Sequence, residues 1–498
     1  MLNRLAYGPK PGDVDRVASM GVLHWVDEQL SPGPDVAREQ LEDGFEIFHL
    51  GRAELAQRFL EARDARRAQK AGSTPRGNDP ALNEMRELNG EFQQLVVARA
   101  VVAESQLREV LCDFWINHFN IFLGKHDERV LLPTFVEETI RPRVLGRFED
   151  LLIATAESPA MMVYLDNAES VASGAIPPQV ARAEMRSYMH SSPRVDSLLT
   201  RMRARMPTGI NENYARELFE LHTLGVEGGY TQKDVEEAAR VLTGWSAEPA
   251  ARGGGFIFRD WAHDHREKTV LGVRFPAGRG QEEGVELLRM LARNPATMLH
   301  ITTQLCQRLV GDDPPAGAIE AGVAAWRRSD GSIREVVRAI VMSPEFWEAA
   351  RARAKFKTPL EFMVSSVRAV GGGVGTDPAL AHAIGRMGQP LYLQPVPTGY
   401  QESGAAWANS SALFERMNIA VALAAGRMPG VTVDLDAIVP TTEDTDTLVD
   451  RVDRVLLSGA MSPRTASVIR REIAGLPPTQ ARTLAAGLGL GGPDFQTQ

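Results

Sequence analysis

The sequence predicts an all-α protein, a large multi-helix domain that carries one minor two-stranded β-hairpin. Apolar residues recur at spacings of three and four through most segments longer than ten residues, which is the period of a helix with one buried face. A hydrophobic content of 44% over 498 residues is enough for a large core. Residues 252–275 break the helical period with Phe-Ile-Phe, a polar cluster and then Thr-Val-Leu-Gly-Val-Arg-Phe, a pattern typical of a hairpin.

The helices follow one another with short, turn-rich breaks. Pro11-Gly12-Asp13 begins a helix that we expect to run to about Leu30. Residues 71–83 are rich in Gly, Ser, Pro and Asn, and they predict a surface loop between two helices. The remaining segments with helical spacing are 33–45, 51–70, 82–123, 133–141, 147–165, 178–206, 211–224, 231–243, 281–292, 295–310, 316–328, 331–348, 357–370, 377–387 and 410–426.

Two segments near the C-terminus depart from this pattern. Residues 388–403 are rich in Pro and Gly but also contain aromatic residues, whereas flexible linkers are rich in Gly and Ser. We therefore expect an ordered loop that packs on the main body. An acidic stretch follows residue 430, and then three short helices. The sequence thus predicts a main helical domain over residues 1–428 and a small C-terminal helical extension over residues 429–498.

Composition excludes several classes of function. The net charge of −9 argues against a nucleic-acid partner, because such proteins usually carry a basic surplus. No apolar run reaches the roughly 18 residues of a transmembrane helix. The first residues lack the basic and apolar segments of a secretory signal, so the chain as written is expected in the cytoplasm. Its two cysteines, Cys112 and Cys306, are too few for a disulfide framework or a zinc cluster, and we expect two buried thiols.

Residues 209–245 combine many hydrogen-bonding side chains with aromatic ones, which indicates a polar site. On a helix over residues 211–224, one side carries Asn213, Glu217 and Glu220. His222 lies on the apolar flank, too far round the helix to share a metal with these glutamates, and is expected to be a core histidine. Two interpretations of the polar side remain open. It holds acid/base or metal-binding carboxylates, or it is a hydrated face with an Arg216–Glu220 ion pair.

Two further segments carry histidines. In Asp113-Phe-Trp-Ile-Asn-His118, Trp115 and His118 share a helical face among aromatic residues. The pKa of such an imidazole depends on its burial, and the segment predicts either a functional histidine or a core one bonded to the backbone. Trp261-Ala-His-Asp-His-Arg-Glu-Lys268 lies in the β-segment. Its His-Asp pair is a metal-ligand motif in helical phosphohydrolases, and the alternative is a polar hairpin tip. Motifs of nucleotide hydrolysis, serine esterases and zinc proteases are absent.

Several sequence blocks resemble one bacterial family, which is catalogued as domain of unknown function 1800. They cover residues 1–425. The most specific block is Asn211-Glu-Asn-Tyr-Ala-Arg-Glu-Leu-Phe-Glu-Leu-His-Thr-Leu-Gly. The other blocks are Leu2-Asn-Arg-Leu-Ala-Tyr-Gly-Pro, Phe114-Trp-Ile-Asn-His-Phe, Gly229-Tyr-Thr-Gln-Lys-Asp-Val, Ala239-Arg-Val-Leu-Thr-Gly-Trp, His263-Asp with Lys268, Lys357-Thr-Pro and Gly388-Gln-Pro.

The resemblance implies a general area of function. Members of the family are helical, are commonly exported, and often neighbour a second family that looks like the sulfatase and alkaline phosphatase group. This resemblance implies a function in the cell envelope or in polysaccharide metabolism. Relatives usually have residues before the first block, so a truncated start would imply a periplasmic or exported protein. This chain departs from the family pattern by lacking a Gly after His263-Asp264 and a Trp near Leu393.

We therefore expect a hydrolase of envelope polysaccharides or esters, with a polar pocket among residues 111–123, 209–224 and 260–268. Its expected partners are a carbohydrate or other small molecule and a protein of the sulfatase-like family. The expected site comprises catalytic Glu217, Glu220, His118, His263 and Asp264, substrate-binding Arg216, Lys268, Asn213, Trp115 and Trp245, and a divalent metal ion on His118, Glu217 and His263. The alternative is a non-catalytic binding or assembly protein whose buried polar networks are structural.

Overall fold

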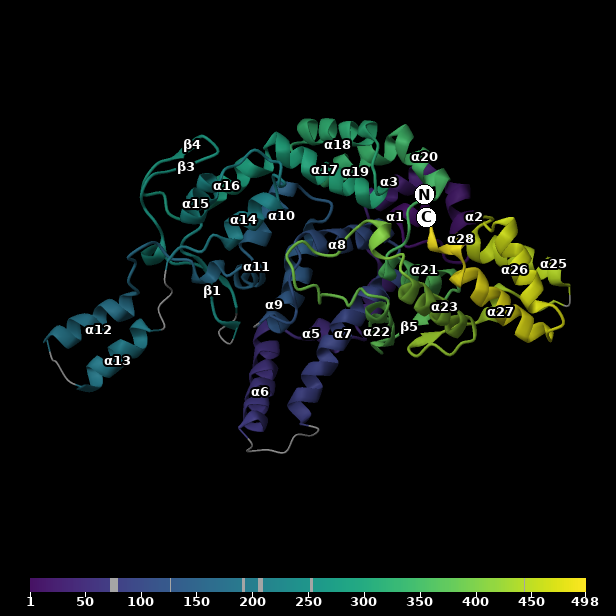
Figure 1. Cartoon of the computed structure of the whole chain (residues 1–498), viewed down its shortest axis with the longest axis horizontal. Helices are drawn as coiled ribbons and strands as arrows, with labels where there is room; N and C mark the ends of the chain where they lie inside the picture. Colours follow the sequence, from purple (N-terminus) through teal and green to yellow (C-terminus); the bar gives the residue numbers. More distant parts are fainter. Residues whose placement is uncertain (72–78, 126, 190–192, 205–208, 251–253, 443) are drawn as a thin grey trace.

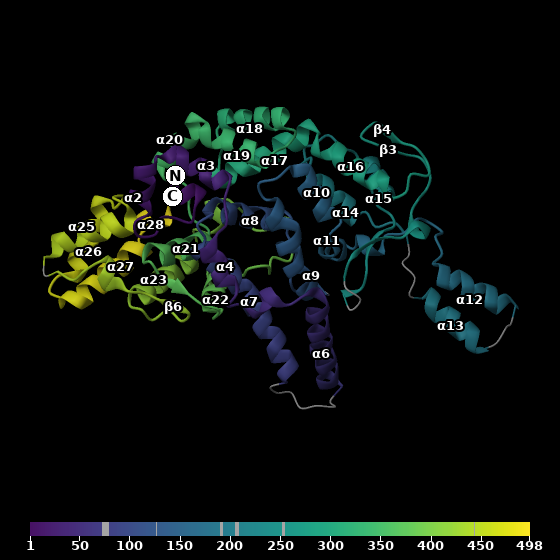
Figure 2. The ribbon, with the colours of Figure 1, turned by 180° about the vertical axis from the view of Figure 1, so that it is seen from behind.

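A computed structural model describes residues 1–71, 79–125, 127–189, 193–204, 209–250, 254–442 and 444–498. Helices make up 64% of the structure, and the strands form small two-stranded antiparallel sheets. The predicted all-α class is therefore confirmed. Figure 1 shows α12 (Pro178–Met189) and α13 (Pro193–Arg203) at one end of the molecule, and α6 (Arg52–Lys70) beside α7 (Pro80–Val102) projecting from its body. The two chain ends lie close together in Figures 1 and 2.

Several helices predicted near the N-terminus are split in two. Gly21, with φ of 91°, separates α2 from α3 because this backbone conformation is open to glycine but strained for other residues. Residues 103–105 likewise separate α7 from α8. The elements of this region are α1 (Leu2–Leu5), α2 (Asp13–Met20), α3 (Val22–Leu30), α4 (Val36–Glu42), α5 (Glu46–His49), α8 (Gln106–His118), α9 (Glu128–Thr134), η1 (Phe135–Ile140) and η2 (Arg141–Arg143).

The central helices begin at residues that suit a helix N-terminus. Pro159 begins α11, because proline fits the first turn but cannot continue the preceding α10. Thr231 caps α15 in a reciprocal capping box with Asp234. The helix predicted over residues 211–224 ends earlier, at Glu220. The elements are α10 (Phe148–Ala156), α11 (Pro159–Tyr164), η3 (Asn167–Glu169), α14 (Asn213–Glu220), α15 (Gln232–Val241) and η5 (Asp260–Ala262).

The predicted pairing of the β-segment is wrong. β2 (Phe256–Phe258) pairs with β1 (Trp245–Ala247), which lies before the predicted segment, while β3 (Lys268–Val270) pairs with β4 (Val273–Phe275). The β3–β4 turn is Leu271-Gly272, and both residues have positive φ, the requirement of a tight two-residue hairpin. The polar cluster therefore connects two sheets and is not a hairpin tip. The third sheet, β5 (Gly373–Val374) with β6 (Val431–Thr432), was not predicted.

The C-terminal extension packs on the main domain. α27 lies along α23, and the backbone amide of Gln498 donates to the carbonyl of Lys355 at 2.8 Å. Buried residues of both regions belong to one hydrophobic core. The helices of the second half are α16 (Glu282–Ala292), α17 (Pro295–Leu309), α18 (Ala316–Ser329), α19 (Ile333–Met342), α20 (Pro344–Ala352), α21 (Pro359–Ala369), α22 (Ala379–Arg386), η6 (Gly404–Ala406), α23 (Ser410–Ala424), α24 (Leu435–Ile438), α25 (Thr445–Val452), η7 (Asp453–Leu457), α26 (Pro463–Ile473), α27 (Pro478–Gly491) and α28 (Pro493–Gln496).

The loop over residues 388–403 is held against the body, as predicted. The Asn117 amide donates to the carbonyl of Tyr400 at 2.8 Å, and the Asn120 amide donates to the carbonyls of Gln394 and Val396 at 3.0 and 2.8 Å. This loop therefore lies against the end of α8 and the residues that follow it. Among the described helices, none has both the length and the apolar character needed to cross a membrane.

Candidate functional site

A buried histidine cluster forms where three parts of the chain meet. They are the end of α8, the segment that follows α14, and helix α17. His118 Nδ1 lies 2.8 Å from Gln304 Oε1, and its Nε2 lies 3.4 Å from the backbone carbonyl of His222. The Gln304 amide nitrogen lies 3.2 Å from Nε2 of His300. The imidazole of His222 packs on Phe119 with ring centroids 5.1 Å apart. Two of the predicted segments, residues 111–123 and 209–224, therefore do converge.

This histidine cluster is neutral. Burial, together with a smaller contribution from the nearby His300, lowers the pKa of His118 to about 3. Burial also lowers the pKa of His222 well below its usual value, with a smaller contribution from His118. Charged imidazoles are unfavourable in an apolar environment without carboxylates. The cluster therefore behaves as a neutral core network, which agrees with the prediction of a core histidine at position 222.

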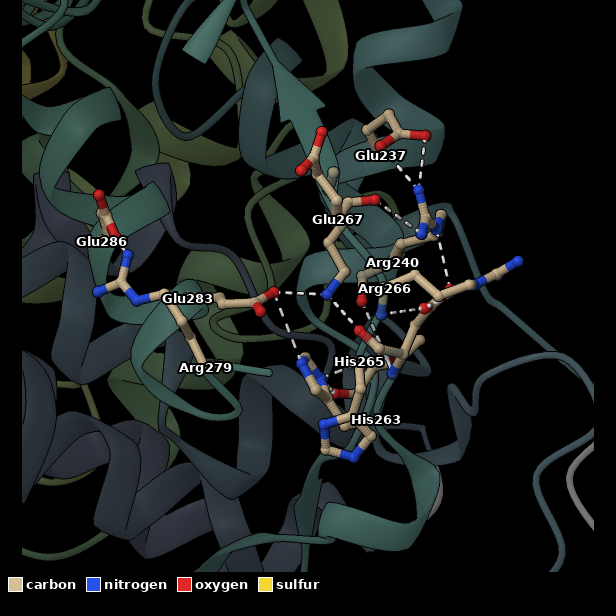
Figure 3. Close-up of polar contacts among 12 residues, drawn as sticks. Glu237, Arg240, His263, His265, Arg266, Glu267, Arg279, Glu283 and Glu286 are labelled. Atoms are coloured by element: carbon tan, nitrogen blue, oxygen red, sulfur yellow. Dashed lines mark hydrogen bonds and ion pairs between the residues drawn. The ribbon is translucent and has the colours of Figure 1, made fainter. Parts of the chain in front are cut away.

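A second cluster joins the polar segment after β2 to α16 (Figure 3). Glu283 Oε2 lies 2.5 Å from the ammonium of Lys268 and 3.6 Å from Nε2 of His263, and all three side chains have an exposed fraction of 0%. His263 Nδ1 lies 2.8 Å from the carbonyl of Thr243 and donates to it. Burial, the largest cause, lowers the pKa of His263. The second nitrogen of His263 and Oε1 of Glu283 have no hydrogen-bond partner within the described chain.

Asp264 connects the polar segment after β2 to α15. Arg240 Nε donates to Asp264 Oδ2 at 2.9 Å, and Arg266 donates to the same oxygen at 2.6 Å. Hydrogen bonds from these two arginines keep the pKa of Asp264 well below its usual value, although burial opposes them. Arg240 also forms a bidentate pair with Glu237, at 2.8 Å for both bonds. Asp264 is therefore an ionised anchor between α15 and the β-segment.

The polar face of α14 is open to solvent. Glu217 is half-buried, and burial followed by the charge of Glu220 raises its pKa. Glu220 accepts a hydrogen bond from Tyr230. Arg216 lies 3.2 Å from Glu212 and 3.8 Å from Glu220, so the predicted Arg216–Glu220 ion pair is present. The face carries two carboxylates with different surroundings.

Asn213 and Tyr164 lie at the border of the polar face of α14. The Asn213 amide donates to the carbonyl of Leu165 at 3.3 Å, which ties the start of α14 to the end of α11. The hydroxyl of Tyr164 donates to the carbonyl of Pro395 at 3.0 Å. Burial raises the pKa of Tyr164 to about 12, and the charges of Glu217 and Glu128 act in the same direction. The loop over residues 388–403 thus reaches the border of the α14 face.

The predicted metal triad is not assembled. His118 contacts Gln304 and the carbonyl of His222, whereas His263 contacts Thr243 and Glu283. Glu217 lies on the open face of α14. In the part of the chain that the structure describes, no group of three or more His, Cys, Asp or Glu side chains could hold a metal ion. The described structure therefore does not bring these three side chains into one group.

Three residues predicted to bind substrate are core residues. Trp115 and Trp245 are fully buried, and the Trp115 indole donates to the carbonyl of Val144 at 3.3 Å. Lys268 is neutralised by Glu283 without exposed surface. Gly284 lies directly against the Trp245 indole, since a Cβ there would come within 2.3 Å of the ring. These side chains present no surface to a ligand, so the polar residues that remain accessible are Asn213, Arg216, Glu217 and Glu220.

Sequence reasoning missed Glu283 and Glu128, and it named Asp113 without assigning it a role. Glu283 follows Glu282 at the start of α16 and resembles an ordinary acidic first turn. Glu128 is fully buried, both of its oxygens lack a hydrogen-bond partner in the described residues, and burial raises its pKa well above the usual value. Asp113 pairs with buried Arg308 at 2.8 Å, and burial raises its pKa to about 6. No local pattern marks these residues, because burial comes from distant segments.

Comparisons with known proteins identify the family but not the activity. The family model described as "Protein of unknown function (DUF1800)" matches residues 1–497. Neither the curated proteins nor the solved structures contain a match to the chain. The family match includes the C-terminal helices beyond residue 425, which agrees with their packing on the main core. The chain belongs to the DUF1800 family.

Proposed function

We propose that this protein is a hydrolase of carbohydrate or ester substrates and that its reaction takes place on the polar face of α14. The observation that carries this proposal is the difference between the two neighbouring carboxyl groups. The pKa of Glu217 is raised by burial and by the charge of Glu220, while Glu220 accepts a hydrogen bond from Tyr230. Two carboxyl groups in unequal environments can divide the roles of acid and base between them.

Glu217 takes the role of the acid because its pKa is raised. Glu217 keeps its proton to higher pH and donates it to the leaving oxygen as the C–O bond breaks. A water molecule supplies the hydroxyl that bonds to carbon, and its proton passes to the carboxylate of Glu220. Asn213 and Arg216 flank these groups and orient the substrate through hydrogen bonds. An envelope substrate would require the protein to act in the periplasm.

Substitution of Glu217 by Gln tests the proposal. We expect the full chain to hydrolyse at least one member of a panel of p-nitrophenyl glycosides and esters, and Glu217→Gln to lower kcat by roughly a hundredfold or more, because amide cannot donate the acidic proton. The matched control is Glu227→Gln at an exposed position outside α14, which should leave kcat unchanged. Equal thermal unfolding of both variants shows that the fold is intact. Unchanged turnover in Glu217→Gln, or no hydrolysis of any substrate by the natural chain, contradicts the proposal.

The second candidate function is a non-catalytic binding or assembly protein. It is favoured by the burial of His118, His263 and Lys268, whose contacts join distant elements and expose no reactive atom. The partner would be a protein of the sulfatase-like family. Co-expression of the two proteins followed by size-exclusion chromatography tests this function. We expect the two proteins to elute together, and Glu217→Gln to leave their co-elution unchanged. Separate elution of the two proteins, together with hydrolysis by the chain alone, contradicts it.

A further inference from the structure

An arginine-lined groove lies between α6, α7 and the start of α9, far along the chain from the α14 face. It has a volume of about 720 Å³. In both views α6 and α7 lie side by side where they leave the body, and α6 also packs on α9 (Figures 1 and 2). Four arginines line the groove, namely Arg63, Arg66, Arg86 and Arg129. No carboxylate is among the described residues that line it.

Among the described residues, three of these four arginines, Arg66, Arg86 and Arg129, form no ion pair. Arg63 lies 3.7 Å from Asp64, and Arg86 donates to the Asn83 side chain at 3.1 Å. Within the described residues, Arg66 and Arg129 have no ion pair and no hydrogen bond to another side chain. Burial lowers the pKa of Arg129, and the charge of Arg66 lowers it further. The charge of Arg66 therefore disfavours the charged form of Arg129, and no described carboxylate pairs with either group.

Arg66 differs from the other arginines of α6, each of which lies within ion-pair distance of a carboxylate. Elsewhere on α6, Arg58 pairs with three glutamates at 2.5 to 3.2 Å, and the chain as a whole has a net charge of −9. Like charges held near each other cost free energy unless an opposite charge is supplied. A bound anion would supply it.

The other lining residues suit a small organic ligand. Phe59, Leu82 and Met85 provide apolar contact, and Asn89 and Gln93 provide amide groups whose side-chain nitrogens donate to backbone carbonyls. Amide oxygens accept hydrogen bonds from ligand hydroxyl groups. The volume falls in the range of small-molecule sites, about 300–1,000 Å³. Guanidinium groups bind phosphate and sulfate oxygens through paired hydrogen bonds.

We propose that this groove binds a small organic ligand carrying phosphate or sulfate groups, which Arg66 and Arg129 hold. The site is separate from the carboxylates of α14. Ligand binding to the groove is measured without any hydrolysis. A negative result for the groove therefore does not contradict the proposed hydrolase, and a negative result for the hydrolase does not contradict the groove. Phosphate and sulfate share the chemistry that arginine recognises, and the probes below distinguish the two.

Calorimetric titration of the full chain tests this site. The probes are inorganic phosphate and sodium sulfate, two tetrahedral anions of similar charge at pH 8, and each is titrated at low and at physiological salt. We expect saturable binding of at least one probe, and Arg66→Gln and Arg129→Gln each to weaken it by roughly tenfold or more, the scale of one charge-assisted hydrogen bond. Stronger binding of phosphate than of sulfate assigns a phosphate ligand, and the reverse order assigns a sulfate ligand.

The control separates a site from a general charge effect. Arg328→Gln on α18 removes one exposed positive charge from another part of the surface, and it should leave binding unchanged. Arg66 and Arg129 are not core residues, so both variants should unfold at the temperature of the natural chain. The proposal would be overturned if Arg328→Gln weakened binding equally or if neither probe bound. It would also be overturned if a single-stranded DNA oligonucleotide bound more tightly than the probes and needed both arginines.

Discussion

Glu283→Ala is expected to destabilise the protein by about 3–5 kcal/mol, the cost of removing one partner from a buried ion pair. The ammonium of Lys268 has an exposed fraction of 0% and would keep only the carbonyl of Asp264 as a partner. Urea unfolding at pH 7.5, followed by circular dichroism, measures the change in free energy.

Two further variants make this prediction specific. Glu286→Gln on the same helix removes a glutamate that pairs with Arg279 at the surface, where both side chains are exposed by 40% or more, so its effect should be below about 1 kcal/mol. Lys268→Met combined with Glu283→Leu leaves no buried charge and should recover most of the stability that Glu283→Ala loses. A loss below about 1 kcal/mol in Glu283→Ala would show that Lys268 is neutral or hydrated.

Acid should destabilise the protein through His118. The pKa of His118 is about 3 in the folded chain against 6.5 for an ordinary histidine. Between these values the unfolded chain binds a proton that the folded chain excludes, so stability falls as the pH decreases from 6.5 towards 3. The interval from pH 6.5 to pH 5 corresponds to about 2 kcal/mol. His222, whose pKa is also lowered, acts in the same direction.

Urea unfolding at pH 7.5, 6 and 5 measures this dependence. His118→Phe removes the imidazole. Between pH 7.5 and pH 5, its free energy of unfolding should therefore decrease by about 2 kcal/mol less than that of the natural chain. His24→Asn is the control, because the His24 side chain is 67% exposed, and it should follow the natural chain at each pH. Identical pH dependence in His118→Phe and the natural chain would show that His118 is not the group responsible.

The candidate site was predicted in part. The spacing of Asn213, Glu217 and Glu220 placed them on one side of a helix, and in the structure they remain on the accessible face of α14. The same helical arithmetic placed His222 away from them, and it is buried beside His118. Both results follow from the geometry of one helix, which local sequence determines. The ion pair of Lys268 could not be predicted, because its partner Glu283 lies on another helix.

The sequence by itself determined the helical class and the positions of most helices, because an apolar period of three to four residues requires a buried stripe on each helix. It also determined which side of α14 is polar. Only the tertiary structure decided which strands pair, which polar side chains lose their water, and which arginines remain without a counter-charge. These properties depend on contacts between residues far apart in the chain, such as Lys268 with Glu283 and His118 with Gln304, and no local pattern encodes the partner of a buried charge.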